Sequence, residues 1–128
     1  MTPIITYLII GVTCVVSYLA FNDSALRARL LFVPAQVKDR GESYRFLTHG
    51  FIHADFMHLL FNMWALYIFG PYAESAFLAM FGAAFGGAAY LLFYLAAIVA
   101  SSYITYTRHA DNYGYSALGA SGAVAAVM

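Results

Sequence analysis

Residues 4–21 read IITYLIIGVTCVVSYLAF, an almost entirely apolar stretch without a charged side chain. At a rise of about 1.5 Å per residue, a helix of this length is about 27 Å long, close to the ~30 Å hydrocarbon thickness of a bilayer. The stretch has neither a basic start nor a small-residue cleavage site, which argues against a cleaved signal peptide. We therefore predict a transmembrane helix over residues 4–21.

The overall composition also indicates a membrane protein. Hydrophobic residues make up 63% of the chain and charged residues 9%, whereas an ordinary soluble domain has about 25% charged residues. We predict an all-α, multi-spanning membrane protein in contact with lipid. The net charge is zero, so no nucleic-acid partner is expected. Cys14, the only cysteine, has no partner for a disulfide.

Three further apolar segments predict spans over about residues 56–73, 76–101 and 121–128. We expect the second span to stop near Pro71. In the span of residues 76–101, the small residues Gly82 and Gly86 have the spacing that lets membrane helices pack closely. The last eight residues cover only about 12 Å as a helix, so we expect residues 1–128 to form one incomplete domain.

The segments between the spans are predicted as loops. Residues 22–48 contain five of the six basic residues and form a long first loop. Residues 102–118 are rich in tyrosine, which favours an anchor at the membrane interface.

A serine between glycines opens the last apolar segment, in the sequence GASG of residues 119–122. A hydroxyl group in such a segment needs polar partners, and residues 56–73 supply His58 and Asn62. These two lie four residues apart and so share a helical face. Two crossings separate Asn62 from Ser121, which places both near the same side of the membrane.

This combination suits acyl transfer. A serine nucleophile needs a base, and the tetrahedral intermediate needs donors directed at its oxyanion, a role that His and Asn side chains can fill. Gly119 and Gly122 would let a substrate carbonyl approach the backbone; the alternative for both glycines is helix packing alone.

Two motifs resemble the rhomboid intramembrane serine proteases: ESYRFLTHGFIHADFMHLLFN over residues 42–62 and GASG over residues 119–122. The resemblance spans nearly the whole chain. It implies a rhomboid-like bundle of six helices, of which this chain holds helices 1–3 and the start of helix 4. It also implies a Ser-His dyad that cleaves peptide bonds in or near transmembrane segments of substrate proteins.

By this resemblance Ser121 is the nucleophile, and His58, Asn62 and backbone amides near Ser121 form the oxyanion hole. Glu74 would lie at the far end of the second helix. The implied location is a prokaryotic plasma (inner) membrane. Structural support is implied for Glu42, Arg45, His53, Gly119 and Gly122, with Glu42 and Arg45 bracing the first loop.

The sequence departs from the family pattern in three places. The family's base is a histidine on the sixth helix, which lies beyond this chain, so we expect the chain by itself to be inactive. His109 lies in a polar segment and is not expected to replace it. Ala125 stands where an aromatic residue is frequent, and Tyr44 where tryptophan is common.

Other functions are less favoured. A rhomboid-like pseudoprotease, which binds transmembrane helices without cleavage, usually lacks the serine or the oxyanion groups that this chain retains. A channel or transporter would need paired charges within the spans. His49, His53 and His58 could in principle bind a metal, but four histidines are too few for a di-iron site, and we expect neither metal nor cofactor.

The orientation of the first loop is a point of conflict. The positive-inside rule would place this basic loop in the cytoplasm. The resemblance implies the opposite side, which we adopt because acidic residues at positions 23, 39 and 42 lie among the basic ones.

Overall fold

The computed structural model describes residues 2–128 and is mainly helical, without a β-strand in that range. Two helices, α1 and α5, are long and apolar enough to cross a membrane. The elements in chain order are α1 (Ile4–Phe21), α2 (Ser24–Leu30), α3 (Pro34–Arg40), α4 (Arg45–Thr48), a 3-10 turn η1 (His49–Phe51), α5 (Phe56–His109) and α6 (Ser121–Val127).

The first helix, α1, covers the same residues as the first predicted span. The segment predicted as a long first loop differs from the prediction, because it contains the short helices α2, α3 and α4. Asp23 explains the first of these, since its side chain caps α2 by accepting the Leu26 N–H at 3.1 Å. The mixture of polar and apolar residues in this segment fits short helices that lie on the bundle.

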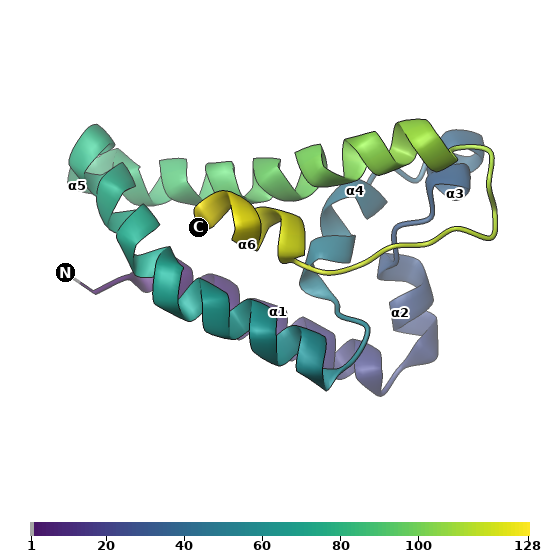
Figure 1. The fold of residues 1–128 in the computed structure, drawn as a ribbon, viewed down its shortest axis with the longest axis horizontal. Coiled ribbons are helices and arrows are strands. Elements are labelled where there is room, and N and C mark those ends of the chain that lie inside the picture. Colours follow the sequence, from purple (N-terminus) through teal and green to yellow (C-terminus); the bar gives the residue numbers. More distant parts are fainter. Residues whose placement is uncertain (1) are drawn as a thin grey trace.

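The α5 helix consists of two arms that meet at Gly82, where the backbone leaves the helical conformation with φ 78° and ψ 168°. The chain reverses there (Figure 1). We call residues 56–81 the first arm and residues 83–109 the second arm.

The predicted boundary between these two helices, at residues 73–76, is therefore wrong. Pro71 lies inside the first arm. A helix packed in a bundle tolerates the loss of the one backbone hydrogen bond that proline cannot make. The reversal instead uses Gly82, since a left-handed backbone favours a residue without a side chain. The second arm also continues past the predicted end at residue 101, as far as His109.

The glycine pair at Gly82 and Gly86 does not form the predicted packing face, because Gly82 lies at the reversal. Gly86 alone permits a close contact: a Cβ atom there would lie 2.5 Å from the Leu78 Cα atom. The absence of a side chain thus lets the two arms approach each other beside the turn.

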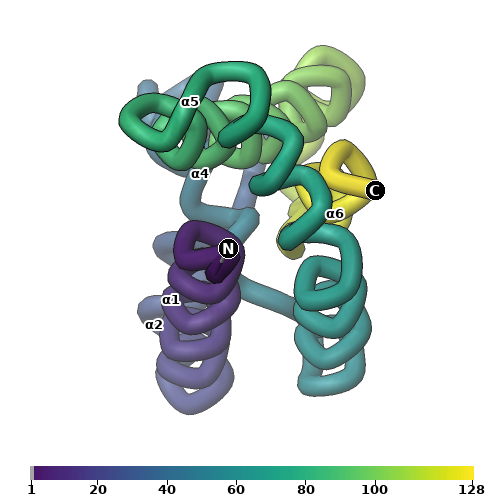
Figure 2. The backbone as a smooth tube through the Cα atoms, turned by 90° about the vertical axis from the view of Figure 1, so that its left-hand side faces the viewer, coloured from purple at the N-terminus to yellow at the C-terminus, as the bar shows by residue number. Residues whose placement is uncertain are grey.

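The buried faces of the long helices follow a spacing of three or four residues, as expected for packed helices. The short α6 lies between the two arms of α5 (Figures 1 and 2). Polar or small residues are frequent on the buried face of α1, whereas large apolar residues such as Leu8 and Val12 are exposed. The core includes Ile9 of α1, Leu59, Met63 and Leu66 of the first arm, Tyr90, Tyr94 and Ile98 of the second arm, and Ala123 and Val124 of α6.

A buried carboxylate joins the first arm to the start of α1. Glu74 accepts hydrogen bonds from the Ile5 N–H at 3.0 Å, the Thr6 N–H at 2.8 Å and the Thr6 hydroxyl at 2.8 Å. Glu74 was expected at the far end of the second helix, but it lies within the first arm. Because the first N–H groups of a helix have no partner inside the helix and carry positive partial charge, an acidic side chain stabilises them.

Candidate active site

Ser121 is the first residue of α6 and is exposed. It borders a cavity of about 210 Å³ between the start of the first arm and the segment that leads into α6. The structure therefore brings Ser121, His58 and Asn62 to one cavity, as the count of membrane crossings predicted. The cavity is lined by His53, His58, Phe61, Asn62, Leu118, Gly119 and Ser121.

His58 and Asn62 lie one helical turn apart on the first arm. The Asn62 Nδ2 atom donates to the His58 carbonyl at 3.1 Å. An asparagine amide has two N–H bonds, so one remains for a ligand. The His58 side chain is exposed, with its Nδ1 atom 3.6 Å from the Asp55 carboxylate.

Asp55 was not singled out from the sequence. It is the N-cap of α5 and accepts the His58 N–H at 2.8 Å, while its second oxygen faces the His58 ring. An Asp directly before an apolar helical segment is a known capping signal and was sufficient to predict this role.

The backbone before Ser121 is fixed by contacts with the segment between α1 and α5. Gly119 has a φ of 112°, a left-handed conformation that favours glycine. Its N–H donates to the His49 carbonyl at 2.9 Å, and the Ala120 N–H donates to the His53 Nε2 atom at 3.3 Å. Two residues before Gly119, Ala117 exchanges two backbone hydrogen bonds with Phe32, at 2.9 and 3.0 Å.

Two exposed side-chain pairs lie beyond this backbone pairing. Lys38 of α3 pairs with Asp111, and the Tyr113 hydroxyl donates to Asp39. Exposed pairs of this kind contribute little free energy. The backbone contacts of Ala117, Gly119 and Ala120 therefore do more to hold the segment.

Gly122 permits close packing of α6 on the second arm. A Cβ atom at this position would lie 2.4 Å from the Ser101 Cβ atom. The packing role considered for Gly122 is thus visible in the structure. A second cavity, of about 180 Å³, lies toward the second arm and is bordered by His49, Ser101, Ser121 and Gly122.

Arg45 and Glu42 lie in the first loop, away from Ser121. Arg45 is buried, and its Nη1 atom donates to the Ala28 carbonyl at 2.8 Å and the Leu31 carbonyl at 2.6 Å. Glu42 lies 3.6 Å from the Arg45 Nε atom. These contacts connect α4 to the end of α2.

The histidines do not gather into a metal site: within residues 2–128, no three His, Cys, Asp or Glu side chains are grouped to hold a metal ion. His49 is buried against the Phe32 ring, with 5.4 Å between the ring centroids. Burial lowers the pKa of His49 below its ordinary value. His109 ends α5 and stacks on Tyr115.

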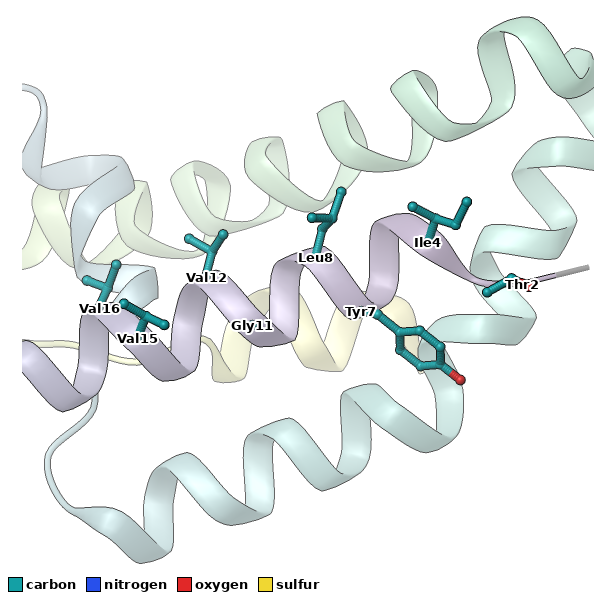
Figure 3. A pocket seen from close by; sticks show the side chains of 8 residues that line it. All are labelled: Thr2, Ile4, Tyr7, Leu8, Gly11, Val12, Val15 and Val16. Carbon is teal, nitrogen blue, oxygen red and sulfur yellow. The ribbon is translucent and has the colours of Figure 1, made fainter.

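A larger, open pocket of about 610 Å³ lies elsewhere, along α1 (Figure 3). Its lining is apolar apart from Thr2 and the Tyr7 hydroxyl, and it includes neither Ser121 nor a histidine. Pocket volume alone would therefore not single out the cavity at Ser121. The lining residues are Thr2, Ile4, Tyr7, Leu8, Gly11, Val12, Val15 and Val16.

Comparison with known proteins identifies the family. A model of the rhomboid domain matches residues 40–128, well over half of the chain. The chain belongs to the rhomboid family. The prediction of a rhomboid-like, all-α membrane protein is thereby confirmed. Among rhomboids, the rhomboid protease GlpG of Haemophilus influenzae is 31% identical over 127 residues, which cover 94% of this chain and 58% of that relative. The chain thus spans a little over half the length of this rhomboid relative.

Acid should destabilise the fold through His53. Burial, with a smaller contribution from the charge of His58, lowers the pKa of His53 from 6.5 to about 4. Between these values the unfolded chain binds a proton that the folded chain does not, so the contribution of neutral His53 is complete above pH 6.5 and is lost toward pH 4. We expect the melting temperature in detergent to fall over this range and to fall less in a His53→Gln variant. Equal slopes for the two proteins would contradict this assignment.

Proposed function

We propose that the protein is an intramembrane serine endopeptidase that cleaves peptide bonds in or near transmembrane segments of other membrane proteins. The observation that carries the proposal is the cavity shared by Ser121, His58 and Asn62. Membership of the rhomboid family and the relative named as a rhomboid protease support it. We further propose a multi-pass location in a prokaryotic inner membrane.

In the proposed reaction the Ser121 hydroxyl attacks the carbonyl carbon of the substrate peptide bond and transfers its proton to a histidine base beyond this chain. The Asn62 amide, a His58 ring N–H and the Ser121 backbone N–H would donate to the oxyanion of the tetrahedral intermediate. Collapse of this intermediate, with the proton passing from the histidine base to the leaving nitrogen, releases the amine product and leaves an acyl ester on Ser121. Water then hydrolyses the ester.

The arrangement within the cavity supports these roles. Asn62 and His58 come from the same face of the first arm, and Ser121 lies at the start of a helix, where backbone N–H groups have no partner inside the helix. The Asp55 carboxylate faces the His58 ring, with 3.6 Å between its oxygen and the Nδ1 atom. A pseudoprotease would not need this convergence of a serine and two donors.

Replacing Asn62 with Ala should reduce cleavage by about 10-fold to 10³-fold, the loss expected when one oxyanion donor is removed. The measurement is kcat for a transmembrane substrate in detergent or lipid, made with the whole protein that includes the base. Asn22→Ala is a matched control, since Asn22 also donates to a carbonyl four residues earlier, at 2.9 Å, but lies at the end of α1. Equal activity of the Asn62 and Asn22 variants would remove Asn62 from the oxyanion hole.

A further inference from the structure

A chain of hydrogen bonds connects α1 to the residue before Ser121. The Ser17 hydroxyl of α1 lies 2.9 Å from the Phe51 carbonyl oxygen and 3.1 Å from the His53 Nδ1 atom. The other ring nitrogen, Nε2, lies 3.3 Å from the backbone nitrogen of Ala120. Ser17, His53 and Ala120 are all buried, with 0–2% of each exposed.

The two ends of this chain determine where each proton lies. A carbonyl oxygen can only accept, so the Ser17 hydroxyl donates to Phe51. The Ser17 oxygen must then accept from His53, which places a proton on Nδ1. The Ala120 N–H can only donate, so Nε2 must be unprotonated. Only the neutral Nδ1–H tautomer of His53 satisfies all three contacts.

The Ala120 contact matters because Ala120 is the last residue before the serine. Its N–H is held by His53, and its carbonyl accepts the Val124 N–H at 2.9 Å, the first hydrogen bond of α6. With the Gly119 N–H bound to the His49 carbonyl, two consecutive amides are fixed on the approach to Ser121. A change at His53 Nε2 therefore changes the backbone that carries the serine.

We infer that Ser17 is a positioning residue: by fixing the tautomer of His53, it holds the Ala120 amide and thereby sets the position of Ser121. The relevance of this position to catalysis rests on the proposed function, but the tautomer and the contact do not. Neither α1 nor α6 contains a charged residue. The ionisable groups near His53 are His58 and its neighbour Asp55 on the side of α5. From α2, the Arg27 Nη1 atom donates to the carbonyl of Ala54, the residue after His53, at 3.3 Å.

The first test is nuclear magnetic resonance of the protein in detergent micelles with ¹⁵N-labelled histidine, near pH 7. The wild type should show His53 protonated on Nδ1 and unprotonated on Nε2. In Ser17→Ala the two tautomers should become mixed, and the Ala120 amide should exchange with solvent faster. The matched control is Thr13→Val, because the Thr13 hydroxyl is buried on the same helix and has no hydrogen-bond partner within residues 2–128.

An Nε2–H tautomer in the wild type, or unchanged His53 and Ala120 signals in Ser17→Ala, would overturn the inference. Should Ser17→Ala fail to fold, Ser17→Cys keeps the shape of the side chain and a weak S–H donor. It should give an intermediate tautomer ratio, and a wild-type ratio in this folded variant would count against Ser17.

The second test separates positioning from general stability. In the whole protein, Ser17→Ala should lower kcat about 3-fold to 30-fold with little change in KM, because loss of one hydrogen bond displaces the nucleophile without altering substrate contacts. Thr13→Val should change neither parameter. A mixed tautomer with unchanged kcat would refute the positioning role while leaving the proposed protease intact. Cleavage by a Ser121→Ala variant would instead exclude Ser121 as the nucleophile of the proposed function and leave the tautomer result standing.

Discussion

Replacing Ser121 with Ala should reduce cleavage of a transmembrane substrate to background in the whole protein. The variant should also lose labelling by a serine-reactive phosphonate probe. No other group in the proposed reaction can form the acyl ester, and loss of a serine nucleophile costs about 10⁶-fold in other serine hydrolases. Ser121 is exposed at the start of a short helix, so the fold should be unchanged.

Ser116→Ala is the control for this experiment. Ser116 is also exposed and lies in the segment before α6, but it does not border the cavity. Its variant should cleave and label at the wild-type rate, and both proteins should have the same melting temperature in detergent. Retained cleavage in the Ser121 variant would exclude Ser121 as the nucleophile.

Replacing Glu74 with Ala should produce the largest loss of stability. The Ile5 and Thr6 N–H groups would lose their acceptor at the start of α1, and an unsatisfied buried polar group costs about 1–3 kcal/mol. Because two N–H groups would be left unsatisfied, we expect a decrease of about 2–6 kcal/mol in the free energy of unfolding. The measurement is equilibrium unfolding in mixed micelles, followed by circular dichroism.

Asp111→Ala serves as the comparison because Asp111 pairs with Lys38 on the surface, with 87% of its side chain exposed. Its loss should change stability by less than about 1 kcal/mol. Similar effects of the two substitutions would mean that the buried contacts of Glu74 do not stabilise α1.

The sequence predicted helices well where a long apolar segment ended in polar residues, as in α1. It misplaced the reversal within α5 because Pro71 was treated as a helix end. Proline costs a helix one hydrogen bond, whereas a change of chain direction needs a backbone conformation that Gly82 can adopt. The more reliable signal was therefore the glycine.

The convergence of Ser121, His58 and Asn62 followed from counting crossings, which needs no detailed geometry. Ser17 could not have been found in this way. A single serine in an apolar helix looks like many others, and its contact with His53 joins residues 36 positions apart. Asp55, in contrast, carried a local capping signal that was overlooked.

The Phe32 and Ala117 pairing, together with the contact between His53 and Ala120, has a consequence for biosynthesis. The ribosome makes the first loop and both arms of α5 before it makes α6, and the two residues of the His53 contact are 67 positions apart. The segment that carries Ser121 can be fixed only after the earlier elements have been inserted and have assembled. Under the proposed function, Ser121 therefore has no ordered position in a nascent chain until its scaffold is complete.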